Sequence, residues 1–126
     1  MRRYALDSSF IINFLEGDER AGEYYFSIKG GKLCIPAPVK LEVLRGVGNM
    51  GVLERIEKKE FSEKEVQVAL DILDHLEQKN QMIGILDIMI ASITTANSLQ
   101  LVTFDRDFEQ LKDYGGFKYK IVNDNE

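Results

Sequence analysis

Four acidic residues lie within or directly after apolar segments of the chain. Asp7 and Asp105 each follow a predicted strand, and Asp87 interrupts the most continuously apolar stretch. Glu42 falls on the apolar face of a predicted helix, between Val39 and Val43. Hard divalent cations take several carboxylate oxygens as ligands and suit such a cluster. The four residues therefore predict a site that holds Mg²⁺ or Mn²⁺ and hydrolyses phosphodiester bonds.

Each acid also has a purely structural interpretation. Aspartate is a preferred helix cap, so Asp7, Asp87 and Asp105 could each cap a following helix. Glu42 could form an ion pair with Lys40 or Arg45. The sequence leaves these alternatives open for each residue taken singly.

Other catalytic chemistries lack the residues they require. His75, the only histidine, lies on a predicted helix between Asp74 and Leu76, and its spacing implies no cysteine or serine partner. With one histidine and one cysteine the chain also has too few ligands for a zinc site. The Gly30–Gly31 pair has neither the spacing nor the lysine of a phosphate-binding loop. Carboxylates remain the candidate catalytic groups.

Composition indicates one globular domain over residues 1–126, with 123–126 as a polar tail. A single cysteine excludes an intrachain disulfide, and no segment has the length of a membrane-spanning helix. We therefore expect a cytoplasmic protein without a membrane partner. A net charge of −5 argues against a broad basic surface for nucleic acid, so any such binding must be local or metal-mediated.

Short apolar strands alternate with helical patterns along the chain. This alternation predicts an α/β fold with a mostly parallel sheet of four to five strands covered on both faces. The predicted strands are 3–6, 32–35, 101–103 and 119–122. The first predicted helix is capped by Ser8 or Ser9 and carries Phe10 to Leu15. The other predicted helices are 19–28, 38–47, 52–58, 63–80, 88–98 and 107–114. In open parallel sheets ligands bind beyond the carboxyl ends of the strands, which is where Asp7 and Asp105 fall.

Four segments in order give the chain a family resemblance. They are 4–9 (YALDSS), 38–46 (PVKLEVLRG), 86–91 (LDIMIA) and 101–108 (LVTFDRDF). Together they resemble a PIN-domain ribonuclease, and in length and layout a VapC toxin of a toxin–antitoxin pair. The resemblance implies a three-layer α/β/α fold, a homodimer, a divalent metal, an RNA substrate and an antitoxin partner.

The resemblance also assigns roles by position. It implies that Asp7, Glu42, Asp87 and Asp105 are the catalytic, metal-binding acids. It adds Ser8, Thr103 and Asp107 as supporting residues. Lys40, Arg45 and Arg106 are the basic residues near these segments, and they do not form an evident RNA track.

Two other functions remain compatible with the sequence. One is a PIN-fold module that binds RNA or protein without cutting, which the presence of all four acids disfavours. The other is a metal-dependent phosphatase, since carboxylates at strand ends also serve that chemistry. A glutamate in the middle of a helix fits a phosphatase less well.

Overall fold

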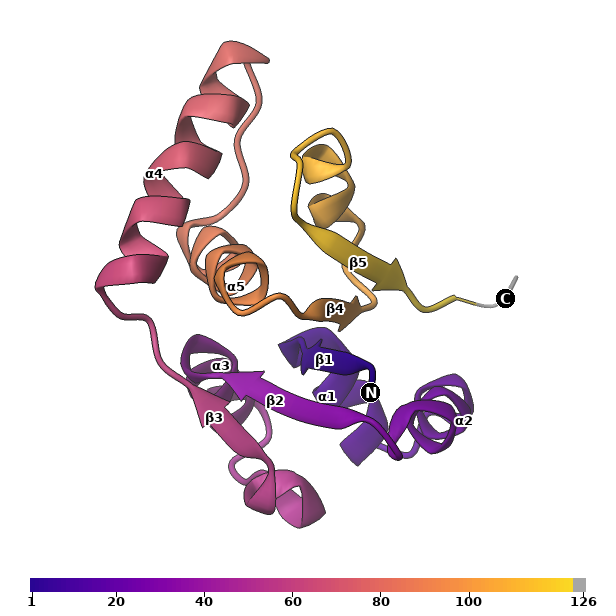
Figure 1. Ribbon diagram of the computed structural model, residues 1–126. Helices are drawn as coiled ribbons and strands as arrows, with labels where there is room; N and C mark the ends of the chain where they lie inside the picture. Colours follow the sequence, from indigo (N-terminus) through magenta and orange to yellow (C-terminus); the bar gives the residue numbers. More distant parts are fainter. Residues whose placement is uncertain (124–126) are drawn as a thin grey trace.

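The computed structural model describes residues 1–123, which contain five parallel strands in one sheet (Figure 1). The order across the sheet is β3-β2-β1-β4-β5. The strands are β1 (Arg3–Leu6), β2 (Lys32–Pro36), β3 (Glu57–Lys59), β4 (Gln100–Thr103) and β5 (Lys118–Ile121). The predicted α/β class and parallel sheet are confirmed. Residues 124–126, most of the predicted polar tail, lie outside the described part.

The register of the central strands decides what lies at the carboxyl edge of the sheet. Leu6 of β1 pairs with Val102 of β4, and the Asp7 amide donates to the Val102 carbonyl at 3.0 Å. Both strands are buried at this point, with Leu6 and Val102 fully inaccessible. The residues that follow, Asp7 and Thr103, are consequently neighbours although 96 positions separate them.

Most helices begin where the sequence provides a local start signal. The Asp18 side chain accepts from the amides of Arg20 and Ala21, and Pro38 occupies the first turn of its helix, where no amide donor is needed. The α-helices are α1 (Ser8–Leu15), α2 (Glu19–Ile28), α3 (Ala37–Gly46), α4 (Glu63–Gln78) and α5 (Ile85–Ala96). Two 3₁₀ helices, η1 (Gly51–Arg55) and η2 (Arg106–Leu111), complete the described elements.

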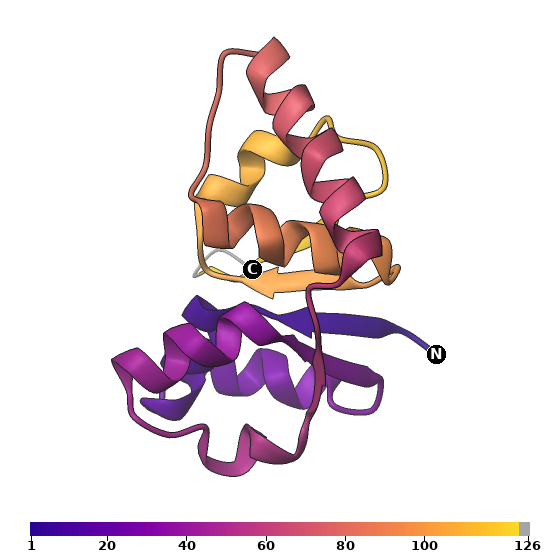
Figure 2. The same cartoon turned by 90° about the vertical axis from the view of Figure 1, so that its left-hand side faces the viewer.

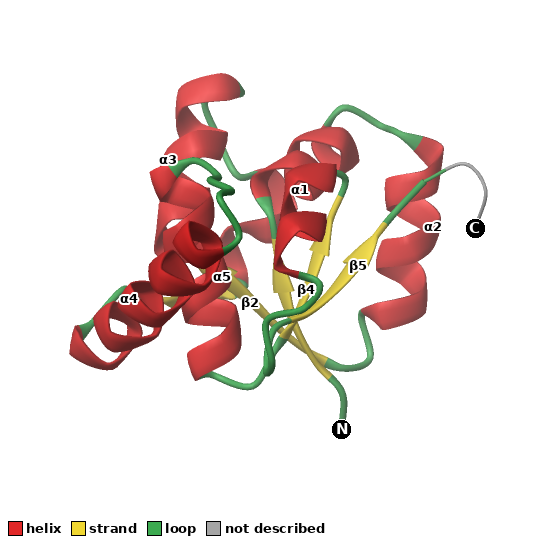
Figure 3. Cartoon of the chain, turned by 90° about the horizontal axis from the view of Figure 1, so that it is seen from above, coloured by secondary structure: helices red, strands yellow, loops and turns green. Residues whose placement is uncertain are grey.

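Helices cover both faces of the sheet, as the view from above shows, with α2 on one side and α4 and α5 on the other (Figure 3). In Figure 2 the indigo-to-magenta part of the chain lies below the orange-to-yellow part. The strands of both parts join in the single sheet between them. This is the predicted three-layer arrangement. Within residues 1–123, none of the helices combines the length and apolarity needed to cross a membrane.

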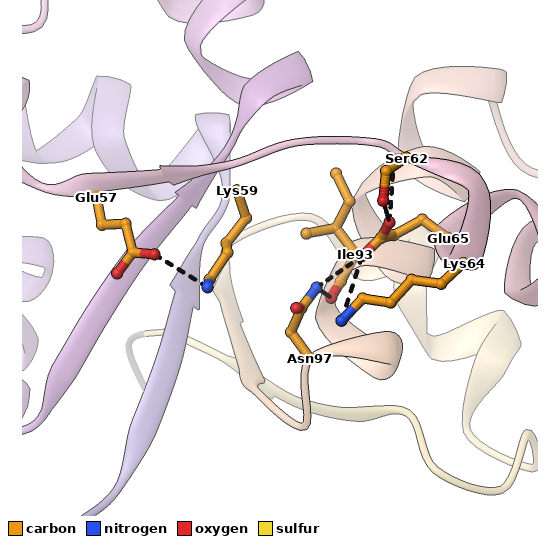
Figure 4. Close-up of polar contacts among 7 residues, drawn as sticks. All are labelled: Glu57, Lys59, Ser62, Lys64, Glu65, Ile93 and Asn97. Carbon is orange, nitrogen blue, oxygen red and sulfur yellow. Dashed lines mark hydrogen bonds and ion pairs between the residues drawn. The ribbon is translucent and has the colours of Figure 1, made fainter.

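A buried carboxylate joins the start of α4 to the end of α5 (Figure 4). Glu65 is 2% exposed and accepts from the Ser62 amide at 3.0 Å, from the Ser62 hydroxyl and from Asn97 Nδ2 at 3.1 Å. These hydrogen bonds hold the pKa of Glu65 below its usual range although burial opposes them. Ser62 and Glu65 form a capping box at the start of α4, and this box is thus also a tertiary link between two helices.

Three predicted elements were wrong in type or extent. Residues 52–58 are not one helix, because the chain ends η1 at Arg55 and then pairs β3 with β2. Helix α5 begins at Ile85 rather than at residue 88, with Gly84 at its amino-terminal cap. The segment predicted as helix 107–114 is the shorter 3₁₀ helix η2. The side chains of β3 are charged and the strand pairs through its backbone. The sequence therefore lacks the apolar pattern from which a strand would be predicted.

Candidate active site

Asp7 is the most buried acid at the carboxyl edge of the sheet. It stands at the amino-terminal cap of α1, is 2% exposed, and makes no side-chain capping hydrogen bond. Its Oδ2 instead accepts from Thr103 Oγ1 at 2.6 Å and from Ser9 Oγ at 2.9 Å. The capping alternative therefore does not account for this carboxylate.

The two hydroxyls that hold Asp7 are oriented by the backbone of the β4–η2 turn. Ser9 Oγ accepts from the Phe104 amide and Thr103 Oγ1 accepts from the Asp105 amide, each at 2.9 Å. The two hydroxyl oxygens are 3.0 Å apart. Because each accepts one amide hydrogen, its own proton is available to Asp7 Oδ2.

The other carboxylate oxygen of Asp7 has no hydrogen-bond partner within residues 1–123. Asp7 Oδ1 is buried and unpaired, which is costly for a charged oxygen. Burial raises the pKa of Asp7 to about 6, although the hydrogen bonds from Thr103 and Ser9 oppose this rise. Such an oxygen is stabilised by either a proton or a cation.

Asp87 is a second acid with a strongly perturbed pKa. It lies in the first turn of α5 rather than at the cap, which is Gly84. Burial and the negative charges of the neighbouring Asp7, Asp105, Glu42 and Asp107 raise its pKa to about 7. Burial is the larger cause, and the charges of the four neighbouring carboxylates raise the pKa of Asp87 further because they lie near it at this edge of the sheet.

Asp87, Asp105 and Asp107 form the tightest acidic group. Each offers a carboxylate oxygen, and the three oxygens lie within 4.8 Å of one another. Asp105 also caps η2, since its Oδ1 accepts from the Asp107 amide at 2.9 Å. The capping alternative is therefore correct for Asp105, but it does not exclude a ligand at its other oxygen. Asp107, predicted as a supporting residue, belongs to this tight group because the η2 turn brings it beside Asp105.

Glu42 reaches the site from α3 and is held by a residue of α1. Its Oε1 accepts from Ser8 Oγ at 2.9 Å. Lys40, the proposed ion-pair partner, binds Glu54 at 3.3 Å instead. Within residues 1–123 no lysine or arginine is ion-paired with any of the five acids, so the ion-pair alternative for Glu42 is not realised.

The donor set fits a hard divalent cation. All available ligands are carboxylate oxygens, at least one of them buried and unpaired, and within residues 1–123 no lysine or arginine is ion-paired with them. Sulfur and imidazole ligands, which favour zinc or copper, are absent from the group. The residues that could hold the ion are Asp7, Glu42, Asp87, Asp105 and Asp107.

Sequence comparison agrees with this arrangement, because the sequence model of the PIN domain family matches residues 4–114. The chain belongs to the PIN-domain family. The matched span of this PIN domain includes all five acids and both hydroxyls that hold Asp7. A comparison with curated proteins by sequence finds no match.

Solved structures share the fold at low sequence identity. VapBC2 from Rickettsia felis, bound to a DNA fragment from its promoter, superposes with a TM-score of 0.80 at 22% identity, covering 95% of this chain and 98% of that one. FitAcB from Neisseria gonorrhoeae superposes with a TM-score of 0.74 at 20% identity, covering 92% of this chain and 95% of that one. VapC20 from Mycobacterium tuberculosis, a sarcin–ricin loop cleaving toxin, superposes with a TM-score of 0.62 at 16% identity, covering 84% of this chain and 92% of that one.

Sequence reasoning missed one residue of the PIN-domain site. Ser9 contacts Asp7, Thr103 and the Phe104 amide, whereas Ser8, the predicted neighbour, contacts Glu42. Two consecutive serines at the start of a helix point in different directions, and the sequence does not say which one faces the sheet. The Asp-Ser-Ser run was the available signal.

Proposed function

We propose that this PIN domain is a metal-dependent endoribonuclease that hydrolyses RNA phosphodiester bonds, and that it is the toxin of a toxin–antitoxin pair. The observation that carries the proposal is the convergence of Asp7, Glu42, Asp87 and Asp105 at one edge of the sheet. Burial and mutual repulsion raise the pKa of Asp87 to about 7, and no basic side chain within residues 1–123 is ion-paired with the group. Clustered acids of this kind destabilise the folded protein by mutual repulsion, and a bound cation would remove that repulsion.

The protein's own residues fix the ligands in the proposed mechanism. Ser9 and Thr103 hold Oδ2 of Asp7 and leave Oδ1 for a cation, and Ser8 positions Glu42. Asp87, Asp105 and Asp107 complete the oxygen set. When bound, Mg²⁺ or Mn²⁺ supplies Lewis-acid activation of the phosphodiester and of the attacking water. The carboxylates would thus hold the ion at the carboxyl edge of the sheet.

An antitoxin partner follows from the same site and from the fold relatives. A toxin–antitoxin complex from Klebsiella pneumoniae and VapBC-5 from Mycobacterium tuberculosis, a member of the VapBC family of toxin–antitoxin systems, share this fold. A cluster of carboxylates without a paired basic residue attracts a basic side chain from a partner. We propose that the antitoxin inhibits by placing such a side chain in the acidic pocket.

Homodimerisation is a further part of the proposal. Leu41 is 61% exposed and Leu44 39% exposed on α3, and Val52 of the following η1 is 76% exposed. Large apolar side chains exposed on these two consecutive elements would be stabilised by burial against a second copy. Light scattering of the purified protein tests this point directly.

The decisive test is cleavage of a mixed RNA pool by the isolated protein. Wild-type protein with Mn²⁺ should cut, and EDTA should stop it. The Asp7→Asn and Asp87→Asn variants should be inactive yet folded, because each change removes one carboxylate oxygen ligand without altering side-chain volume. A matched control is Asp74→Asn, an exposed carboxylate on the outer face of α4.

Three results would contradict the nuclease. Full activity in either active-site variant would show that the acids do not act on RNA. An inactive wild-type protein with Mn²⁺, free of any partner, would favour a PIN-fold module that binds without cutting. Release of inorganic phosphate from small esters without RNA cleavage would indicate a phosphatase.

A further inference from the structure

The amino edge of the sheet, opposite the acidic site, carries two adjoining hollows of about 270 Å³ each. One is lined by Arg2, Arg3, Gln100 and Lys118, among others. The second extends it past Ser98 to Thr95, and the two share Ser98, Leu99 and Lys118. We call this continuous feature the basic groove.

The basic groove is a local exception in an acidic protein. It contains three basic side chains and no acidic one, whereas the whole chain has a net charge of −5. Within residues 1–123, none of Arg2, Arg3 and Lys118 forms an ion pair, although Lys32, Lys40, Lys58, Lys59 and Lys79 all do. Uncompensated cations around one hollow produce a positive potential at that place.

The polar groups of the basic groove suit phosphate. Two guanidinium groups and one ammonium group are donors that phosphate oxygens accept. The only apolar side chain in the groove, Leu99, is 1% exposed and offers no anchor for a peptide.

A purely structural role explains only part of this pattern. Lysine on an edge strand such as β5 discourages pairing with another sheet, which accounts for Lys118. Arg2 and Arg3 lie at the start of β1, the central strand, where there is no free edge to protect. Their convergence with Lys118 needs another explanation.

We propose that the basic groove binds backbone phosphates of the RNA substrate, away from the bond that is cut. The inference rests on the proposed nuclease. The four-residue strands separate the two edges of the sheet by only about 13 Å, so one RNA molecule can contact both. The groove supplies the local phosphate affinity that the net charge of the protein denies elsewhere.

Binding without cleavage tests the basic groove. Labelled single-stranded RNA is titrated in EDTA, by fluorescence anisotropy, against wild type and the triple variant Arg2→Gln, Arg3→Gln, Lys118→Gln. Losing three phosphate contacts should lower the slope of log affinity against log salt by about 2. The control variant Lys29→Gln, Arg55→Gln, Lys64→Gln changes the net charge equally at exposed sites elsewhere and should retain the wild-type slope.

Other outcomes separate this inference from the nuclease itself. Equal slopes for the triple variant and the control would overturn the groove even if RNA is cut. A lower slope of log affinity against log salt in the triple variant supports RNA binding by the basic groove, even if the wild-type protein cuts nothing. If inorganic phosphate displaces labelled RNA as well as unlabelled RNA does at the same total phosphate concentration, the groove is a small-anion site only. If a glutamate-rich peptide displaces the labelled RNA as well as unlabelled RNA does, the groove is a protein site. If the triple variant misfolds, the single variant Lys118→Gln, at an exposed position, provides the test. It should lower the slope of log affinity against log salt by about 0.7.

Discussion

Replacing Asp7 with asparagine should stabilise the metal-free protein at neutral pH while abolishing its response to metal. Asp7 is 2% exposed and its Oδ1 is unpaired, so its charge is destabilising in the folded state. The pKa rises from 3.8 to about 6 on folding. At 1.36 kcal/mol per unit, this rise of about 2 units corresponds to about 3 kcal/mol.

The direction of the pH effect follows from proton linkage. A carboxyl whose pKa is raised by folding binds more protons in the folded state, so its contribution is favourable at low pH and is lost as pH rises. For Asp7 the loss runs from about pH 4 to about pH 6. Asparagine cannot ionise. The free energy of unfolding of the variant relative to wild type should therefore rise by about 3 kcal/mol between pH 4 and pH 7.5.

Urea unfolding in EDTA at pH 4 and pH 7.5 measures this difference, and a repeat with Mn²⁺ measures the metal response. At 100 times its Kd, the metal should stabilise wild type by about 2.7 kcal/mol and the variant by much less. Asp18→Asn is a control of opposite sign, because the hydrogen bond from Arg20 lowers the pKa of Asp18. A variant no more stable than wild type at pH 7.5 would refute the reasoning.

Three further predictions concern residues around the site and in the core. Ser9→Ala removes one of the two hydroxyl donors to Asp7 and should weaken Mn²⁺ binding, measured by calorimetry, about tenfold; unchanged affinity would refute a role for Ser9. Asn97→Ala unties α5 from Glu65 and should cost about 2 kcal/mol in urea unfolding, whereas Asn80→Gly, outside that link, should be near neutral. Gly31→Ala places a Cβ 2.7 Å from the Arg2 carbonyl and should lower the Tm, whereas Gly30→Ala, with no atom within 4 Å, should not.

Local sequence signals determined much of this fold. Helix α2 has the predicted bounds, and the box at Ser62 and Glu65 starts α4, because caps act on amides only a few residues away. Helix α1 begins at Ser8 with Asp7 at its cap, so the predicted cap at Ser8 or Ser9 was wrong. Buried parallel strands need apolar runs, so β1, β2 and β4 were also visible in the sequence. Asp7 and Asp105 could be placed at one edge because Asp7 directly follows β1 and Asp105 comes two residues after the end of β4.

Only the tertiary structure decided the rest. β3 forms because the edge of β2 offers backbone partners to a charged segment, which no side-chain pattern reports. The choice of Ser9 over Ser8 as the contact of Asp7, and the entry of Asp107 into the acidic group, depend on how α1 and η2 are turned against the sheet. The raised pKa values of Asp7 and Asp87 likewise come from burial and from charges distant in the chain. Residue type is encoded locally, whereas orientation and electrostatic environment arise from packing.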